Sequence, residues 1–191
     1  MDAERVKQVT VEDLMSMGGE ARVEVVCGEI IEMSPSGTLH HWIAANMQRL
    51  LNQLVDQDQG MVFPDGLIFL LDKGTAGIKG ARVPDVAYVR RDDFPEQWDI
   101  EKPFPGAPTL AVEVMSPNDS TQETLERVRD YLTAGSTEVW VVYPRQQELH
   151  RYQSADLSAV AVYREDDVLT FEALEIRTSA LFVLPDWLPQ K

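Results

Sequence analysis

The residue whose position is most unusual for its type is Glu113, a single carboxylate within the apolar run Thr109 to Met115. Because side chains alternate along a strand, Glu113 shares one face of this run with Ala111 and Met115. An ionised carboxylate buried on such a face is costly unless it is paired with a cation, protonated or bound to a metal. The alternative is an edge strand on which Glu113 faces water.

A second carboxylate, Asp85, follows Pro84 inside another strand-like run, Arg82 to Val89. Two carboxylates on neighbouring strands suit Mg²⁺ or Mn²⁺, because these cations accept oxygen ligands and keep waters that a substrate can displace. A bound ion of this kind polarises a phosphoryl oxygen and activates water for attack. The pair of Asp85 and Glu113 therefore predicts metal-dependent hydrolysis.

Helical spacing and capping signals predict the helices that must position these acids. Apolar side chains repeat every three or four residues from Leu39 to Val55, the pattern of one long amphipathic helix. A second helix is predicted to begin after Ser120 and to end at Gly135, because glycine tolerates the left-handed conformation that follows a helix. A short helix from Thr10 to Met17 opens with a capping-box pattern.

Short segments rich in β-branched and aromatic residues predict the strands. The runs Thr109 to Met115 and Thr137 to Tyr143 flank the second helix and predict a β-α-β crossover with a parallel strand pair. The remaining predicted segments are a hairpin of Arg22 to Cys27 and Glu29 to Met33, strands at Val62 to Leu71 and Arg82 to Val89, antiparallel strands from Glu148 to Phe171, loops at Gly74 to Gly80 and Pro95 to Pro108, and a terminal apolar anchor at Leu181 to Leu188. We expect one α/β domain over residues 1–191, a mixed β-sheet flanked by helices with an additional antiparallel hairpin region.

The composition is that of an acidic globular chain. It has 191 residues, and 17 basic against 32 acidic side chains give a net charge of −15. This charge opposes non-specific attraction to nucleic-acid phosphates, which depends on Lys and Arg. The single cysteine, Cys27, excludes an intramolecular disulfide, and no stretch resembles a membrane span or an export signal, so a cytoplasmic protein is expected. The sequence has neither the glycine motifs of nucleotide-binding proteins nor the nucleophile elbow of serine hydrolases.

Several short segments, taken in their order and spacing, resemble a known family. They are Glu24 to Glu29 with Met33 to Pro35, His40 to Ile43, Pro84 to Val86, Pro108 to Pro117, Tyr131 to Gly135 with Glu138 to Val142, and His150 to Tyr152. On these segments the chain resembles the Uma-type family of bacterial restriction endonucleases within the PD-(D/E)XK nuclease superfamily. The resemblance implies a restriction-endonuclease-like fold and Mg²⁺-dependent hydrolysis of phosphodiester bonds in DNA.

The resemblance also implies roles for single residues. Asp85 and Glu113 match the two acidic metal ligands, and the main-chain carbonyl of Val114 matches the third ligand. Met115 stands where the superfamily has a lysine, and Arg127 stands where Uma-type sequences commonly place that lysine, on the following helix. An arginine can hold a phosphate or orient a water, but it stays protonated and cannot act as a base.

Glu24 and His40 match further positions near the site of this family. Glu24 is expected to bind the metal or a metal-bound water, and the alternative is a hairpin residue that faces solvent. His40 is expected to contact phosphate or water, and the alternative is a solvated pair with His41 at the start of the helix. We interpret His150 as ordinary sheet surface.

Two functions follow from the sequence. The first is a Mg²⁺- or Mn²⁺-dependent DNA endonuclease, expected to be a homodimer because a two-fold axis matches the symmetry of duplex DNA. The second is a nuclease-fold protein with weakened or lost chemistry that serves as an acidic binding or regulatory partner. Met115, Arg127 and the net charge favour the second.

Overall fold

A computed structural model of the protein describes residues 8–17, 22–75, 77–117 and 119–188. Its helices are α1 (Val11–Ser16), α2 (Thr38–Asp56) and α3 (Thr121–Ala134), with short 3₁₀ helices η1 (Arg91–Asp93) and η2 (Thr178–Leu181). Thr10 and Ser120 form capping boxes at the starts of α1 and α3, and Gly135 ends α3 with a φ of 115°. The capping signals in the sequence therefore predicted these helix ends.

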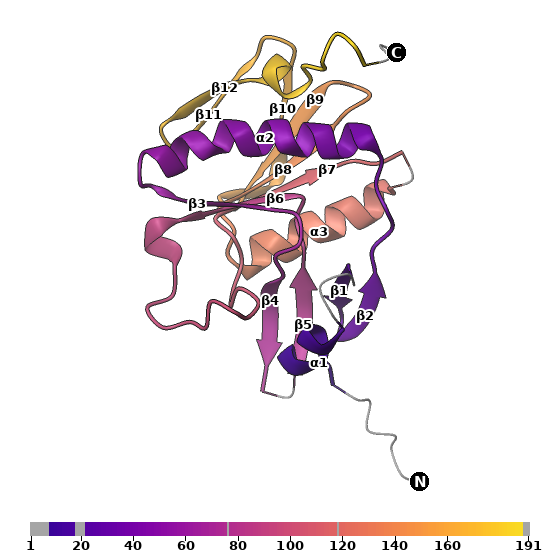
Figure 1. Ribbon diagram of the computed structural model, residues 1–191, viewed down its shortest axis with the longest axis vertical. Coiled ribbons are helices and arrows are strands. Elements are labelled where there is room, and N and C mark those ends of the chain that lie inside the picture. Colours follow the sequence, from indigo (N-terminus) through magenta and orange to yellow (C-terminus); the bar gives the residue numbers. More distant parts are fainter. Residues whose placement is uncertain (1–7, 18–21, 76, 118, 189–191) are drawn as a thin grey trace.

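A six-stranded sheet forms the centre of the fold, in the order β10-β9-β8-β7-β6-β3 (Figure 1). Its strands are β3 (Gly60–Pro64), β6 (Val86–Arg90), β7 (Leu110–Val114), β8 (Glu138–Tyr143), β9 (Glu148–Gln153) and β10 (Asp156–Arg164). β7 and β8 are parallel and α3 connects them, which confirms the predicted crossover. The other pairs in this sheet are antiparallel, so the sheet is mixed, as expected.

The two long helices cover opposite faces of this sheet (Figure 1). Leu110 and Val112 of β7 pack in the core beneath α2, together with the small hairpin of β11 (Val168–Phe171) and β12 (Leu174–Arg177). Ala111 packs on the other face, against α3. The alternation predicted for β7 is thus correct, and it places Glu113 on the face that α3 covers.

A second, antiparallel sheet carries the N-terminal hairpin, in the order β2-β1-β5-β4. Its strands are β1 (Val23–Val26), β2 (Glu29–Glu32), β4 (Phe69–Gly74) and β5 (Gly77–Arg82). The predicted hairpin of β1 and β2 is confirmed, and α1 packs on this sheet through the buried Leu14. The chain therefore passes between the two sheets three times, from β2 through α2 to β3, from β3 to β4 and from β5 to β6.

Two segments predicted as single strands are each divided between two strands, and a proline marks each division. The run Val62 to Leu71 divides at Pro64 into β3 and β4, and the run Arg82 to Val89 divides at Pro84 into β5 and β6. Proline has no N–H group to donate to a ladder, so strand pairing ends there and the chain enters the other sheet. Asp85 consequently lies at a crossing between sheets rather than within a strand.

The glycine-rich segment Gly74 to Gly80, predicted as a loop, is instead the tip and the start of a hairpin between β4 and β5. Gly77 has a φ of 143°, and a Cβ atom there would lie 2.9 Å from the carbonyl oxygen of Val9, so glycine is required. The segment Pro95 to Pro108 holds neither helix nor strand, as predicted. The predicted terminal anchor is anchored only at its start, because Leu181 is buried while Trp187 is 80% exposed. Among the described helices, none has the length and hydrophobicity needed to cross a membrane.

Candidate active site

Strand pairing brings Asp85 and Glu113 together. β6 and β7 are antiparallel with Val86 opposite Val112, and continuing this register by one residue sets Asp85 opposite Glu113. Oδ2 of Asp85 accepts a hydrogen bond of 2.7 Å from the main-chain N–H of Val114, which holds the carboxylate against the end of β7. Both acids are buried, with 7% and 8% of their surface exposed. The alternative of a solvent-facing Glu113 is therefore excluded by the fold.

His40, in the first turn of α2, lies beside Asp85. Its Nε2 is 3.0 Å from Oδ2 of Asp85, and the imidazole is buried. Burial by itself lowers the pKa of His40, but the hydrogen bond and the charge of Asp85 outweigh it, so the pKa is raised from its ordinary value. The two histidine rings are in edge-to-face contact, but His40 is buried against Asp85 and is not solvated. Only His41 is exposed, where it contacts the Ser36 hydroxyl.

Glu113 is a buried acid with few partners. Its Oε1 accepts a hydrogen bond of 2.9 Å from the Tyr131 hydroxyl, and its Oε2 is 3.8 Å from Arg127, too far for a hydrogen bond. Burial raises its pKa, the charge of Arg127 opposes this, and the charges of Asp85 and Glu24 add to it, so the pKa rises from 4.5 to about 8. Strongly perturbed carboxyl groups of this kind are typical of functional sites.

Glu24 and Arg127 complete the cluster. Arg127, on α3, donates a hydrogen bond of 2.8 Å to Oε1 of Glu24, on β1. Glu24 also accepts from the Val83 main chain at 3.2 Å and from Arg82 at 2.7 Å, and only 2% of its surface is exposed. Burial tends to lower the pKa of Arg127, but the neighbouring charges of Glu113 and Glu24 raise it, so this guanidinium stays protonated. The alternative of a solvent-facing Glu24 is excluded.

All five predicted side chains therefore meet in one cluster, at the junction of the two sheets, α2 and α3. The sequence did not predict the contacts of three further members, which are Arg82 with Glu24, Asp130 with Arg82 and Tyr131 with Glu113. Tyr131 carried a signal, since it follows Arg127 by one helical turn and falls in a family segment. Arg82 lies close to Asp85 in the sequence, but its pairing with Asp130 carried no signal, because the two residues lie 48 positions apart in the chain.

Three further charged or titratable residues, Arg90, Arg91 and His150, lie away from the cluster. Arg90 and Arg91 follow Asp85 in sequence, but β6 carries them to its opposite end, where they pair with Glu172 and Asp58. His150 lies on β9 beside Glu148 and against the ring of Tyr143. Of the arginines near Asp85 in the sequence, Arg82 thus joins the cluster, whereas Arg90 and Arg91 do not.

The donor set fits a hard divalent cation. Asp85 and Glu113 offer carboxylate oxygens, and one oxygen of Glu113 accepts no hydrogen bond from the described residues; burial, together with the charges of Asp85 and Glu24, raises the pKa of Glu113. Among the described residues, no group of three or more His, Cys, Asp or Glu side chains is arranged as a metal site. Mg²⁺ commonly binds through one or two carboxylates and retains waters, so a two-carboxylate site matches its chemistry.

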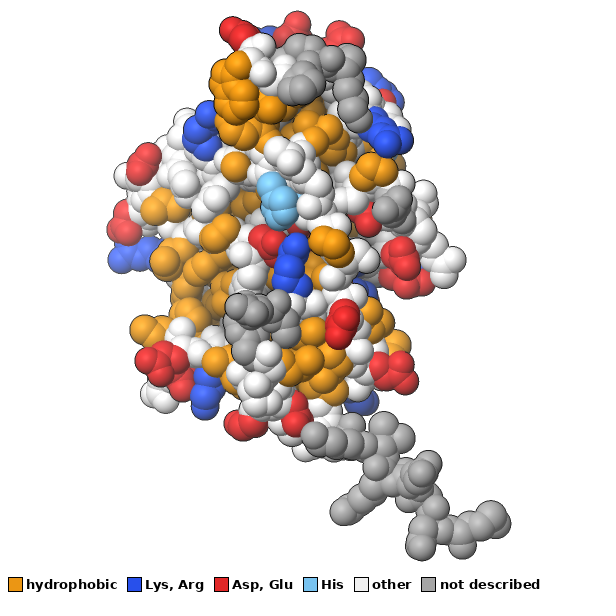
Figure 2. All heavy atoms as spheres, turned by 45° about the vertical axis from the view of Figure 1, so that its right-hand side comes forward, with side chains coloured by type: hydrophobic (Ala, Val, Ile, Leu, Met, Phe, Trp, Pro, Cys, Tyr) orange, Lys and Arg blue, Asp and Glu red, His pale blue; other side chains and the backbone are white. Residues whose placement is uncertain are grey.

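The cluster opens to solvent on the side of Arg127. Its side chain is 26% exposed, against 9% for Asp85 and 10% for Glu113. Figure 2 shows a face on which a histidine, acidic side chains and a basic side chain lie next to one another. An incoming anion would therefore meet the Arg127 guanidinium before the carboxylates.

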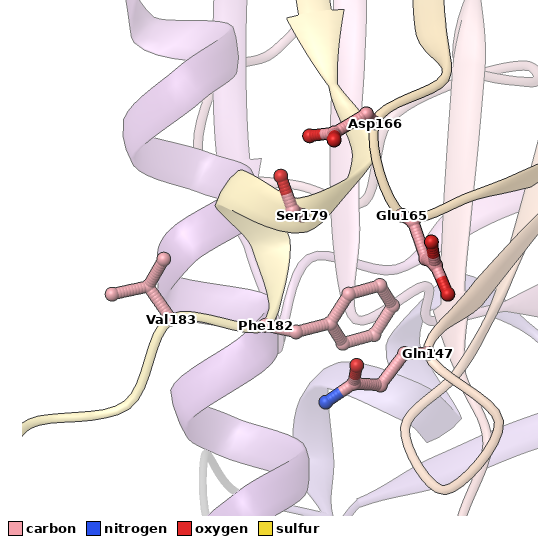
Figure 3. Close-up of a pocket in the computed structure, with 6 residues that line it drawn as sticks. All are labelled: Gln147, Glu165, Asp166, Ser179, Phe182 and Val183. Carbon is pink, nitrogen blue, oxygen red and sulfur yellow. The ribbon is translucent and has the colours of Figure 1, made fainter.

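Two pockets away from the cluster do not supply further phosphate-binding groups. One cavity of about 250 Å³ is lined by Gln147, Glu165, Asp166, Ser179, Phe182 and Val183, so its charged groups are both acidic (Figure 3). A second, of about 480 Å³, holds Arg90 and Arg91 together with three acidic side chains. Both pockets lack an excess of positive charge, which distinguishes them from phosphate-binding clefts.

The central mixed sheet, flanked by helices, sets a buried aspartate beside a buried glutamate at the ends of neighbouring strands, and this architecture agrees with the restriction-endonuclease-like fold expected from the sequence. The chain belongs to the Uma2 family, described as "Putative restriction endonuclease", which it matches over residues 10–181. The family resemblance of the sequence segments is thereby confirmed.

A solved structure agrees with this assignment at the level of the fold. The crystal structure of "a putative nuclease belonging to DUF820" from Anabaena variabilis ATCC 29413 is similar to this chain, with a TM-score of 0.74 and 19% sequence identity. The similarity covers 91% of this chain and 97% of that one. No curated protein matches the chain.

Proposed function

We propose that this protein is a metal-dependent endonuclease that hydrolyses phosphodiester bonds in DNA. The observation that carries the proposal is the buried pair of Asp85 and Glu113, in which Glu113 has a raised pKa and an oxygen without a hydrogen bond. A structural role would not require an acid in this setting, because an apolar residue would be cheaper to bury. Family membership supports the same conclusion.

Asp85 and Glu113 would hold Mg²⁺ or Mn²⁺, with the main-chain carbonyl of Val114 as a further ligand. When bound, the ion supplies charge stabilisation at the phosphoryl oxygens and lowers the pKa of water. His40 and the Val114 N–H both bind Oδ2 of Asp85, so they fix the orientation of this carboxylate and leave Oδ1 toward a cation. Arg127 would bind the scissile phosphate and stabilise the charge that develops on it.

Glu24 has a different role in this scheme from the one its sequence position suggested. Both of its oxygens already accept hydrogen bonds, from Arg82, Arg127 and the main chain of Val83. We infer that Glu24 acts by holding Arg127, rather than as a primary metal ligand. This arrangement keeps a permanent positive charge beside the two acids.

The experiment that tests the proposal is a calorimetric titration with Mn²⁺, combined with cleavage of supercoiled plasmid. Wild type should bind Mn²⁺ and nick the plasmid, and Asp85→Ala should do neither. Asp58→Ala is the matched control, because this carboxylate is 85% exposed and pairs with Arg91 at the other end of β6. Equal Mn²⁺ binding by wild type and Asp85→Ala would contradict the proposed site.

A specific observation favours the second function, an acidic binding or regulatory partner. Met115 occupies the position of the superfamily lysine, and its sulfur lies 3.1 Å from the Thr124 hydroxyl of α3, so α3 covers this position. A wild-type protein that binds no Mn²⁺ and leaves plasmid, linear and single-stranded DNA intact would support this function instead.

We further propose that the active form is a homodimer, since cleavage of both strands needs two scissile phosphates to be engaged. The exposed side chains of Val183 and Trp187 offer an apolar contact surface beyond the buried Leu181. Light scattering at micromolar concentration should give twice the mass of the chain, and a monomer would contradict this part of the proposal.

A further inference from the structure

Four charged side chains form a row of three ion pairs next to the two acids, and α3 joins the two ends of this row into a ring. Arg127 contacts Glu24 at 2.8 Å, Glu24 contacts Arg82 at 2.7 Å, and Arg82 contacts Asp130 at 2.6 Å and 3.0 Å. Asp130 and Arg127 stand three positions apart on α3, so they are neighbours on the surface of one helix. The ring therefore begins and ends on α3 and passes through β1 and β5.

The inner half of the ring is buried and the outer half is accessible. Glu24 and Arg82 have 2% and 5% of their surface exposed, whereas the side chain of Asp130 is 44% exposed. Arg82 uses three nitrogens, one toward Glu24 and two toward Asp130, which fixes the plane of its guanidinium. Glu24, held by Arg82 and by the Val83 main chain, thus presents Oε1 to Arg127 in one orientation.

Arg127 needs such a support to act at a defined place. Its long side chain has many rotamers, and ordering it costs rotamer entropy. Glu113 does not restrain it, because the 3.8 Å separation is too long for a hydrogen bond. The contact that locates the guanidinium is the one to Glu24, and the orientation of Glu24 depends in turn on Arg82.

We propose that Arg82 and Asp130 are positioning residues, which hold Glu24 and through it place the Arg127 guanidinium beside Glu113. The importance of this placement rests on the proposed function, because Arg127 is useful there only if a phosphate binds next to it. Through this ring a carboxylate on the outer surface of α3 would act on a buried site, because Asp130 contacts Arg82 from the solvent side.

Asp130→Ala is the variant that opens the ring at its accessible point. Alanine has the highest helix propensity, so the substitution does not weaken α3. Glu126→Ala is the matched control, since it removes one exposed carboxylate from the same helix, and its partner is Gln122 rather than a member of the ring. Asp130→Asn is the milder second variant, because it keeps the shape of the side chain and removes only the charge.

The first measurement does not depend on activity. In ¹⁵N-resolved NMR of arginine side chains, the Arg127 guanidinium should give slowly exchanging signals in wild type and in Glu126→Ala. These signals should broaden or vanish in Asp130→Ala, and to a smaller degree in Asp130→Asn. Arg127→Lys assigns them by their disappearance. Unchanged Arg127 signals in Asp130→Ala would overturn the inference.

The second measurement is the turnover of plasmid cleavage with Mn²⁺. Asp130→Ala should lower kcat by about tenfold or more, the loss that removal of an orienting partner causes at metal sites, with little change in KM. In an Arg127→Ala background, Asp130→Ala should have no further effect, since the two substitutions act on the same group. Additive losses would overturn the inference. If wild type does not cleave DNA, the proposed function fails, and the NMR result alone decides whether the ring positions Arg127.

Discussion

Two buried glutamates on neighbouring parallel strands differ in how their charge is satisfied. Glu138, at the start of β8, accepts hydrogen bonds from Trp140 at 2.8 Å, from Gln153 at 3.2 Å and from two nitrogens of Arg151. Glu113, at the end of β7, accepts one, from Tyr131 at 2.9 Å. Their exposures are nearly equal, 6% for Glu138 and 8% for Glu113.

The difference separates a structural acid from a functional one. A carboxylate with a dedicated guanidinium and further donors is compensated within the fold and has no need of a ligand. Glu113 faces two other acids and shares its cation with Glu24, so the cluster around it has more negative charge than its partners balance. Burial and charge type are the same at the two sites, and the hydrogen-bond partners and the neighbouring charges distinguish them.

The largest expected effect that tests this comparison comes from Arg127, the cation next to Glu113. Arg127→Ala should reduce plasmid cleavage by about 10²- to 10³-fold, the cost of removing one group that stabilises transition-state charge. Arg127→Lys should retain or raise activity, because lysine keeps the charge and can lose its proton when desolvated. The measurement is kcat with Mn²⁺ on plasmid and on single-stranded DNA. Wild-type turnover in Arg127→Ala would refute the role assigned to this residue.

A smaller effect is expected at Glu138, the structural acid. Glu138→Gln should lower the free energy of unfolding by about 3 kcal/mol, because it leaves the guanidinium of Arg151 without its counter-charge in a partly buried position. The side chain of Arg151 is only 16% exposed, so water compensates it poorly. Urea denaturation measures the loss. Cleavage per folded molecule should stay at the wild-type level, and a specific loss of activity would place Glu138 in the active site.

Local anomalies in the sequence were enough to find the two central acids. Glu113 interrupts an apolar alternation, and Asp85 follows a proline, so both could be selected without knowledge of the fold. The family pattern then added Arg127, Glu24 and His40. The parallel pair of β7 and β8 followed from one helix flanked by two apolar runs.

The remaining features depend on contacts that no local pattern encodes. Apolar residues lie on both sides of Pro64 and of Pro84, and only the strand pairing shows that the chain changes sheets at these prolines. Arg82 and Asp130 meet across 48 residues, so their pairing depends on how α3 docks against β5. The oxygens of Glu24 are occupied for the same reason, and its position in the sequence therefore suggested a metal ligand.

The smallest expected effect is a change in the free energy of unfolding of Glu113→Gln, measured in EDTA at pH 8. It contrasts with Glu138→Gln because the expected change has the opposite sign. Burial beside Asp85 and Glu24 raises the pKa of Glu113 to about 8, so its ionisation opposes folding when no metal is present. A neutral amide of the same shape keeps an acceptor for Tyr131 and removes this repulsion, so the free energy of unfolding should rise by about 1 kcal/mol, within the usual range for such substitutions. Urea denaturation of both variants measures the expected rise in the free energy of unfolding for Glu113→Gln and the expected fall for Glu138→Gln. A fall in the stability of Glu113→Gln comparable to that of Glu138→Gln would mean that Glu113 is also a compensated structural acid, and the distinction between the two sites would fail.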